Sequence, residues 1–371
     1  MTSFKTTSME EDLVQILYDL AWGQLHVGYW KDTPTAWRDV FSLSCLYLGY
    51  LSEAKGDIQH ALEKLDLGIL MGGPTFRNNL HCYVKYLHHP HNRPNLPAPS
   101  PKTEIQQQTR QPSRKRKRSD INFEPLLNPS LEIPRVKVPS LTCFLRNYMS
   151  CKKPVIITGL MANWPALGGA RSWNNFSYLK SIAGMRTVPI ELGKNYLDKD
   201  WTQTLMPLST FIDDYILKES EEIGYLAQTQ LLDQIPELKE DIMIPDYCGL
   251  SLDDSSSDEV IIHSWFGPKG TISPIHYDKY HNLLSQVFGR KYLRIYDTDQ
   301  TPFLYPHQDK LSFNSSQVDA ERPDLQLFPL FEKASYKECI LGTGEMLYIP
   351  PNYWHYVRSL ETTFSLSFWW S

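Results

Sequence analysis

The 371-residue sequence contains no apolar run near the ~20 residues that a membrane-spanning helix needs. Its first 12 residues are polar and then acidic, without the basic-then-apolar order of a secretory signal. Its six cysteines are scattered, with no CxxC pair typical of zinc sites and no dense disulfide framework. These absences predict an intracellular protein without a membrane span, whose cysteines are reduced core residues.

The net charge is only −5, but it is distributed unevenly along the chain. The stretch 93–118 holds eight Lys and Arg residues and one acidic residue, whereas the rest of the chain holds 29 basic against 41 acidic side chains. We therefore expect the folded parts to be acidic. An acidic body disfavours nucleic-acid binding and favours basic protein or peptide partners.

Changes in pattern predict three parts: an α-helical N-terminal domain at 1–90, a disordered basic linker at 91–120 and a β-rich domain at 121–371. In the first part, two sets of apolar residues have helical spacing and predict helical hairpins: Leu13, Ile16, Leu17 and Leu20, then Val40, Leu43, Leu46, Tyr47 and Tyr50. Residues 53–66 loosely resemble one tetratricopeptide unit, although a single copy cannot stack into a solenoid. The domain is therefore either a partner-binding module or a plain helical accessory domain.

The linker is rich in proline and polar residues and cannot bury enough apolar surface to offset its ordering entropy. It contains five consecutive cations at 114–118. Such a run is a solvated segment, a nucleic-acid patch or a nuclear-localisation signal. We favour the last, which predicts binding to a nuclear import receptor and a nuclear location, with the cytoplasm as a second location.

The third part consists of short β-rich runs separated by turns. The runs predicted as strands are 154–159, 187–191, 260–266, 283–287, 292–296, 346–349 and 364–370. The turns at 288–291 and 350–352 have hairpin chemistry, and 208–217 reads as a helical insert. Many short strands with helical inserts predict a mainly β fold, a jelly-roll or cupin barrel.

A candidate metal site lies within this part. Residues two apart in a strand project from the same face, so His276 and Asp278 should point together into the barrel. A third ligand should come from a facing strand, and His355, just after a tight turn, offers it. Two histidines and one carboxylate on one face of an octahedron favour Fe(II), because three positions remain for a bidentate 2-oxo acid and O₂.

Further residues fit the co-substrate 2-oxoglutarate. Asn282 is expected on the same strand as His276, and Lys291 lies across the next predicted hairpin. An inward lysine suits the distal carboxylate of 2-oxoglutarate through a charge-assisted hydrogen bond. Ser273 and Tyr225 offer hydroxyl donors for the same ligand.

From about residue 139 to 371, two-thirds of the chain, the sequence resembles the jumonji-C oxygenases. The segments that carry this resemblance are Gly224–Gln228, Gln234–Leu238, Ile244–Cys248, Gly289–Tyr292 and Phe364–Ser371. The resemblance implies a double-stranded β-helix catalytic domain at 121–371, with no catalytic residue beyond the metal ligands. It also implies Fe(II) at His276, Asp278 and His355, and 2-oxoglutarate at Tyr225, Ser273, Asn282 and Lys291.

The resembling group includes histone lysine demethylases, hydroxylases of arginyl residues and histone-tail peptidases. The residues of the group's arginine pocket match here at Glu191, Tyr196, Gln228 and Trp265. A carboxylate can pair bidentately with a guanidinium, and an indole can cover its flat face. No zinc reader spacing accompanies the domain, which favours a protein hydroxylase over a chromatin demethylase.

We therefore expect hydroxylation of an arginyl residue in a basic protein, such as a histone or a ribosomal or chromatin-associated protein. The alternatives are a methyl-lysine demethylase, a histone-tail peptidase and a weakly catalytic nuclear scaffold. A peptidase ranks last, because no Ser/His/Asp or second-metal arrangement is evident. The acidic loop 253–259 is either solvated or steers basic peptides toward the site. Because no helices follow the run at 369–370, we expect a monomer.

Overall fold

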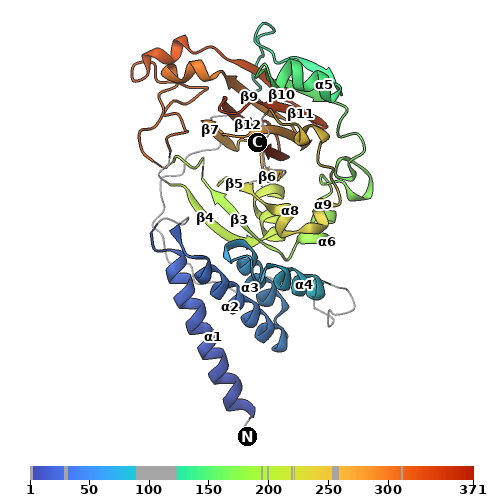
Figure 1. Ribbon diagram of the computed structural model, residues 1–371, viewed down its shortest axis with the longest axis vertical. Coiled ribbons are helices and arrows are strands. Elements are labelled where there is room, and N and C mark those ends of the chain that lie inside the picture. Colours follow the sequence, from blue (N-terminus) through green and yellow to red (C-terminus); the bar gives the residue numbers. More distant parts are fainter. Residues whose placement is uncertain are drawn as a thin grey trace. The chain divides into compact units, whose positions relative to one another are not determined.

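The computed structural model describes residues 3–28, 32–88, 123–193, 195–198, 200–218, 220, 222–252, 259–310 and 312–371. The chain forms two compact units. The helical unit comprises Met1–Lys117 with Met185–Thr187, and the β unit comprises Arg118–Gly184 and Val188–Ser371 (Figure 1). The whole linker predicted at 91–120, including the run 114–118, lies outside the described residues, as do residues 253–258 of the acidic loop.

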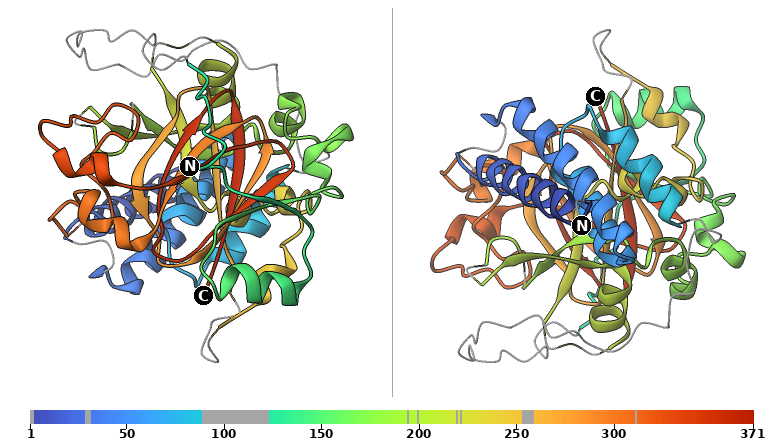
Figure 2. Two further views of the ribbon diagram at one scale, coloured as in Figure 1. Left: turned by 90° about the horizontal axis from the view of Figure 1, so that it is seen from above. Right: turned by 90° about the horizontal axis from the view of Figure 1, so that it is seen from below.

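The described part of the helical unit contains four helices, and each packs on the next along the chain (Figure 2). They are α1 (Ser3–Leu25), α2 (Thr35–Ala54), α3 (Ile58–Met71) and α4 (Arg77–His88). Asp57 begins α3 because its carboxylate accepts a hydrogen bond from the His60 backbone N–H at 3.0 Å, which satisfies one of the free N–H groups of the first turn. Aliphatic residues of α3 and α4 form one buried core of this unit, and residues of α1, α2 and α3 form a second.

The helices predicted in this unit are present, but the apolar residues whose spacing predicted them are mostly not the residues that pack. On α1 the face that packs holds Tyr18, Ala21 and Leu25, whereas Leu13, Ile16, Leu17 and Leu20 are exposed. On α2 the buried residues include Phe41, Cys45 and Leu48, while Leu43, Tyr47 and Tyr50 are exposed. Both helices carry apolar residues on more than one side, so periodicity alone could not choose the side that meets a neighbour.

The β unit contains two sheets. The large sheet has nine strands in the order β1-β2-β11-β8-β13-β6-β5-β3-β4, and the small sheet has four in the order β10-β9-β12-β7. The strands are β1 (Arg135–Lys137), β2 (Val155–Thr158), β3 (Thr187–Leu192), β4 (Thr202–Pro207), β5 (Gly224–Thr229), β6 (Ile261–Gly267), β7 (Ile272–Tyr277), β8 (His281–Phe288), β9 (Lys291–Tyr296), β10 (Lys337–Leu341), β11 (Glu345–Ile349), β12 (Trp354–Ser359) and β13 (Thr363–Trp370). Short helices decorate them: α5 (Leu141–Phe144), α6 (Phe176–Ala183), α7 (Leu208–Phe211), α8 (Leu231–Gln234) and α9 (Pro236–Lys239).

Alternate residues along one strand of this unit face two different layers. On β13, Phe364, Leu366 and Phe368 enter a large core that also holds residues of α6, α7 and α8, whereas Ser367 and Trp369 face the space between the two sheets. Successive residues of a strand project to opposite faces, so one strand serves both layers. The mainly β, double-stranded β-helix prediction with a helical N-terminal part is confirmed, and the insert at 208–217 is helical as expected.

The two turns with hairpin chemistry do not make hairpins. Gly289 and Arg290 join β8 of the large sheet to β9 of the small sheet, and 350–353 join β11 to β12 in the same way. Gly289 has φ +77°, and a Cβ at this position would lie 2.2 Å from the Thr362 carbonyl oxygen. A glycine is therefore required at this corner, where the chain crosses between sheets.

Two expectations from composition can be compared with the described residues. None of the described helices combines the length and the apolar character needed to cross a bilayer. All six cysteines are free, but only Cys45, Cys248 and Cys339 are buried, while Cys82 and Cys151 are exposed. The expectation that every cysteine is a core residue was therefore wrong.

Candidate metal centre

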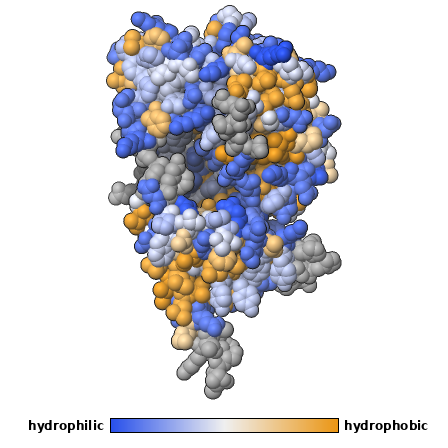
Figure 3. Space-filling model, in the orientation of Figure 1, coloured by the Kyte–Doolittle hydropathy of each residue, from blue (hydrophilic) through white to orange (hydrophobic). Residues whose placement is uncertain are grey.

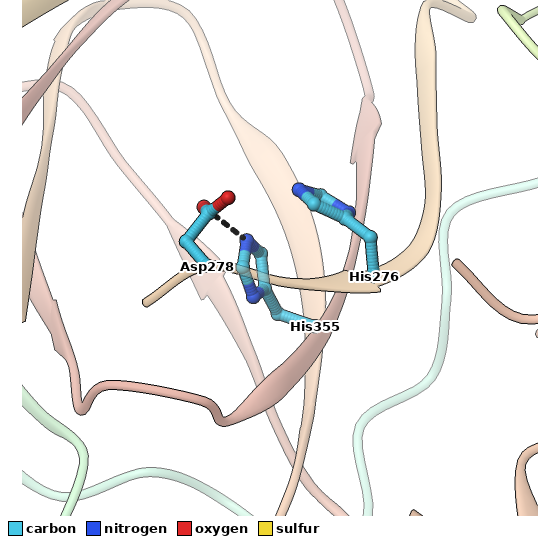
Figure 4. A group of neighbouring side chains, drawn as sticks. All are labelled: His276, Asp278 and His355. Atoms are coloured by element: carbon cyan, nitrogen blue, oxygen red, sulfur yellow. Dashed lines mark ion pairs between the residues drawn. The ribbon is translucent and has the colours of Figure 1, made fainter. Parts of the chain in front are cut away.

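Three predicted ligands meet between the sheets of the β unit. His276 lies in β7, Asp278 follows that strand directly, and His355 lies opposite His276 in the neighbouring antiparallel strand β12. Each residue offers one ligand atom within 4.8 Å of those of the other two. The His355 Nε2 and Asp278 Oδ2 atoms are 3.7 Å apart (Figure 4). Two adjacent strands thus gather two imidazoles and one carboxylate in one place.

Hydrogen bonds orient both imidazoles. The Nδ1 atom of His276 lies 2.7 Å from the Pro274 carbonyl oxygen, and that of His355 lies 3.0 Å from the Tyr353 carbonyl oxygen. Because a carbonyl can only accept, each Nδ1 must carry the hydrogen, which leaves the Nε2 lone pair free. This is the backbone support that metal-ligating histidines commonly have.

The electrostatics of the cluster also fit a cation. Burial, with a further contribution from His276, holds the pKa of His355 well below its ordinary value, so this imidazole is neutral. Burial raises the pKa of Asp278, an effect partly offset by His276 and His263. Without a cation nearby, burial disfavours the ionised carboxylate. A divalent cation would favour the ionised carboxylate and neutral imidazoles together.

A small cavity opens beside this cluster. Its walls come from both sheets and include eight of the predicted site residues: Tyr225, Trp265, Ser273, His276, Asp278, Asn282, Lys291 and His355. Sequence reasoning missed the remaining lining residues: Leu284, Ile349, Val357, Ser367 and Trp369. These residues occupy inward-facing positions of β8, β11, β12 and β13. Because every second residue of a strand faces the same side, strand alternation could have identified them from the sequence.

One part of the cavity is suited to an anion. Lys291 is 1% exposed, and its Nζ donates a hydrogen bond to the Tyr225 hydroxyl at 3.3 Å. Burial lowers the pKa of Lys291 to about 7. Among the described residues no carboxylate lies within ion-pair distance of it. The Asn282 amide oxygen is buried without a hydrogen-bond partner. A carboxylate ligand would offset the desolvation of the lysine.

Asn282 does not lie where the sequence prediction placed it. It is the second residue of β8 in the large sheet, whereas His276 lies on β7 in the small sheet. The bend at 279–280 carries the chain from one sheet to the other. Asn282 therefore reaches the cavity from the wall opposite the histidines, which local spacing could not show.

Of the residues predicted to bind substrate, Trp265 lines the cavity, and its indole N–H donates to Ser367 Oγ at 3.0 Å. Glu191 pairs with Tyr225 across β3 and β5. Burial raises the pKa of Glu191, an effect partly offset by the Trp201 indole.

Tyr196 shares a hydrogen bond of 3.1 Å with Ser315. Burial raises the pKa of Tyr196 to about 12, and Asp278 and Glu191 both contribute to the increase. The ionisation of Tyr196 is therefore coupled to Asp278 of the metal cluster and to Glu191.

Gln228, the fourth residue predicted to bind substrate, is exposed. It has φ +47° and lies at the irregular pairing between β5 and β6. Sequence spacing could not anticipate this bulge, and the cavity lining does not include Gln228.

His263 was not predicted from the sequence. It lies two residues before Trp265 on β6, and its ring contacts Trp369 edge-on, with centroids 4.5 Å apart. Burial lowers the pKa of His263 to about 4 despite the opposing effect of Asp278. Its Nδ1 is buried without a hydrogen-bond partner. Alternation along 261–267 would have placed it on the same face as Trp265.

Taken together, a two-sheet barrel with an internal His–Asp–His cluster and a buried lysine defines a cupin with a candidate metal centre. Comparison with known proteins agrees with this class. A family profile for a cupin-like domain matches residues 140–371. A second profile, described as KDM8-like N-terminal ARM repeats, matches residues 5–96, so the loose tetratricopeptide resemblance at 53–66 was misleading.

Similar proteins extend over almost the whole chain. Lysine-specific demethylase 8 of Danio rerio is 45% identical over 362 residues, covering 96% of this chain and 86% of the relative. The protein of the same name in Xenopus tropicalis is 40% identical, covering 97% and 88%. Jumonji C domain-containing protein 5 of Drosophila melanogaster is 36% identical, covering 96% and 86%. The chain belongs to the jumonji-C family of 2-oxoglutarate-dependent dioxygenases, in the group of lysine-specific demethylase 8.

Proposed function

We propose that this chain is an Fe(II)- and 2-oxoglutarate-dependent oxygenase that hydroxylates an arginyl residue of a basic protein. His276, Asp278 and His355 would hold the iron, because their three ligand atoms converge and both histidines present a free Nε2. When bound, iron and 2-oxoglutarate supply the activation of O₂ that the protein side chains cannot perform alone.

The buried lysine supports the assignment of the co-substrate. Lys291 would pair with the distal carboxylate of 2-oxoglutarate, with the Tyr225 hydroxyl beside it. Ser273 and Asn282 line the same cavity and offer further polar contacts. The Asn282 amide NH₂ can donate a hydrogen bond to 2-oxoglutarate, whose carboxylate and keto oxygens can only accept. These residues bind and orient the ligand, and the apolar side chains of Leu284 and Val357 exclude water around it.

The observation that carries the choice of arginine is Glu191. This carboxylate is largely buried next to the cavity residue Tyr225, and no described cation lies within ion-pair distance of it. A guanidinium offers two parallel N–H donors that match the two carboxylate oxygens, whereas a methylated ammonium has no such fork. Trp265 lines the cavity and offers a flat face on which a guanidinium can stack.

Demethylation of methyl-lysine is the second candidate, and the names of the relatives from Danio rerio and Xenopus tropicalis favour it. A methylated ammonium would use aromatic faces rather than a carboxylate. Tyr225 and Trp265 provide two such faces, with ring centroids 6.1 Å apart. The two reactions give different products, because one adds an oxygen atom to arginine and the other releases formaldehyde.

The test incubates the iron-loaded full chain and 2-oxoglutarate with three versions of each basic peptide, containing arginine, lysine or methyl-lysine at one position. We expect a one-oxygen mass gain only on the arginine version. Formaldehyde release from methyl-lysine, with no oxygen gain on any arginine peptide, would reverse this assignment.

Replacing Glu191 tests the role of the carboxylate. Glu191→Gln keeps the shape but removes the charge, and breaking a buried charge pair costs about 2–5 kcal/mol. Hydroxylation should therefore fall by about 30-fold or more, whereas peptide-independent 2-oxoglutarate consumption should persist. The exposed Glu332→Gln is the matched control and should leave both rates unchanged.

The charge distribution supports a basic substrate and a nuclear location. The chain outside 93–118 is strongly acidic, which would favour association with basic proteins such as histones. The run 114–118 supports recognition by an import receptor.

A further inference from the structure

The first helix of the helical unit carries a row of exposed aliphatic side chains. Met9, Leu13, Ile16 and Leu20 are exposed by 63%, 55%, 61% and 48%. Their spacing of four, three and four residues places them along one line of α1, and the row extends for about 16 Å at 1.5 Å per residue. Leu17, also exposed, borders it. Figure 3 shows hydrophobic side chains gathered on the helical unit. We call the four residues the α1 seam.

Packing within the helical unit does not account for the seam. The face of α1 that contacts α2 holds Tyr18, Ala21 and Leu25, and at 100° per residue this face is opposite the seam. α1 therefore has two apolar sides, one packed and one exposed. Isolated apolar residues are common on protein surfaces, but a continuous row of large aliphatic residues marks an interaction site.

The spacing of the seam indicates what shape covers it. Residues at intervals of four and three follow the 3.5-residue repeat with which one helix packs against another through knobs-into-holes contacts. Grooves that bind single helices use the same pattern of anchors. The complementary partner is therefore a helix lying along α1.

The flanks of the seam indicate the charge of that helix. Glu10, Asp12 and Asp19 are exposed and take the positions that border a helix–helix seam, and the sequence 9–28 contains no Lys or Arg. A second copy of α1 would place acidic flanks against acidic flanks. The basic stretch 93–118 of this chain has the opposite charge, but its only large aliphatic residues are Leu96 and Ile105, too few for a matching seam.

We propose that the α1 seam binds an amphipathic helix of another protein, with aliphatic residues at heptad spacing and Lys or Arg on both flanks. The apolar surface continues onto α2 on one side, where the Tyr47 hydroxyl lies 3.5 Å from Glu10 Oε2 and Tyr50 is also exposed. This side gives basic side chains of the partner both a carboxylate and an aromatic face.

The experiment uses the full chain and three fluorescent 21-residue peptides. The first has Leu at both seam positions of each heptad and Lys on both flanks, the second has Glu on the flanks, and the third is a scrambled version of the first. Binding is followed by fluorescence anisotropy at low and high salt. We expect the basic peptide to bind at least tenfold more tightly than either other peptide, and more weakly as salt rises.

Variants identify the surface that binds. Leu13→Gln together with Ile16→Gln should weaken binding of the basic peptide at least tenfold. The exposed Asn79→Ala, on α4 of the same unit and outside the seam, is the control and should not. Circular dichroism and 2-oxoglutarate consumption should be unchanged in both variants, because the seam is not packed within the described residues. Reversing the three flank charges with Glu10→Lys, Asp12→Lys and Asp19→Lys should switch the preference to the acidic peptide.

Three results would overturn the proposal. Equal binding of the basic and scrambled peptides would show that only the charge of the chain acts. Basic-peptide binding that is insensitive to the Leu13→Gln and Ile16→Gln pair would place the interaction elsewhere. Light scattering that shows a dimer of the full chain, converted to monomer by the same pair, would make a second copy the occupant.

Discussion

Replacing Lys291 with methionine should have opposite effects on ligand binding and on the stability of the ligand-free protein. The side chain is 1% exposed, and burial lowers its pKa to about 7. Methionine keeps a similar length without the charge. Without Lys291 the distal carboxylate of bound 2-oxoglutarate would lose its charged partner, which costs about 2–5 kcal/mol. The KM for 2-oxoglutarate should therefore rise by about 30-fold to several thousand-fold.

The stability effect follows from proton binding. In the unfolded chain the lysine has its ordinary pKa of about 10.4, so the unfolded state holds more protons than the ligand-free folded state at and above pH 7. The cost to the folded state is fully present below pH 7 and disappears as the pH rises toward 10. Lys291→Met should therefore stabilise the ligand-free protein at pH 7, by up to the order of 4 kcal/mol.

Binding of 2-oxoglutarate should depend on pH for the same reason. About half of the Lys291 side chains are neutral at pH 7 in the ligand-free protein, and nearly all are neutral at pH 8.5. Because the charged form binds the carboxylate, wild-type affinity should fall by about 15-fold between these pH values. Lys291→Met should bind weakly at both.

Calorimetric titration and thermal unfolding measure these effects, with the exposed Lys333→Met as the control. 2-Oxoglutarate should raise the melting temperature of the wild type and of the control, but not that of Lys291→Met. Unchanged affinity in Lys291→Met, or a ligand-free variant less stable than the wild type, would refute the reasoning.

Three further predictions concern the metal, the core and the linker. His276→Ala should abolish both iron binding and 2-oxoglutarate turnover, and full iron content by metal analysis would show that the site is misassigned. Asp241 is completely buried and accepts a hydrogen bond from the Trp173 indole N–H at 2.9 Å. Asp241→Ala should therefore lower the free energy of unfolding in urea by at least about 1–3 kcal/mol. An unchanged midpoint of the urea unfolding curve would contradict this. Replacing the five cations at 114–118 with glutamine should leave a tagged protein mostly in the cytoplasm by microscopy, and undiminished nuclear signal would remove their role.

Local sequence patterns were enough to indicate the β unit and the chemistry of its site. The runs 364–370 and 292–296 form strands within one residue of the predicted bounds, because short runs rich in aromatic and aliphatic residues favour a strand locally. His276 and Asp278 could be predicted as metal ligands from the sequence alone, because they are a histidine and a carboxylate two positions apart in a strand. Lys291 could be selected because it follows the next predicted turn and an inward lysine suits the distal carboxylate of 2-oxoglutarate.

Only the tertiary structure decided which distant residues meet. Antiparallel pairing of β7 with β12 places His355 opposite His276, and crossings between the sheets bring Asn282 to the opposite wall. Both depend on strand register, which no short window of sequence contains. The bulge that leaves Gln228 outside the cavity lining and the choice of the packed face of α1 have the same origin. Residue types and their period are local properties, whereas the face that becomes buried is chosen by the neighbour against which it packs.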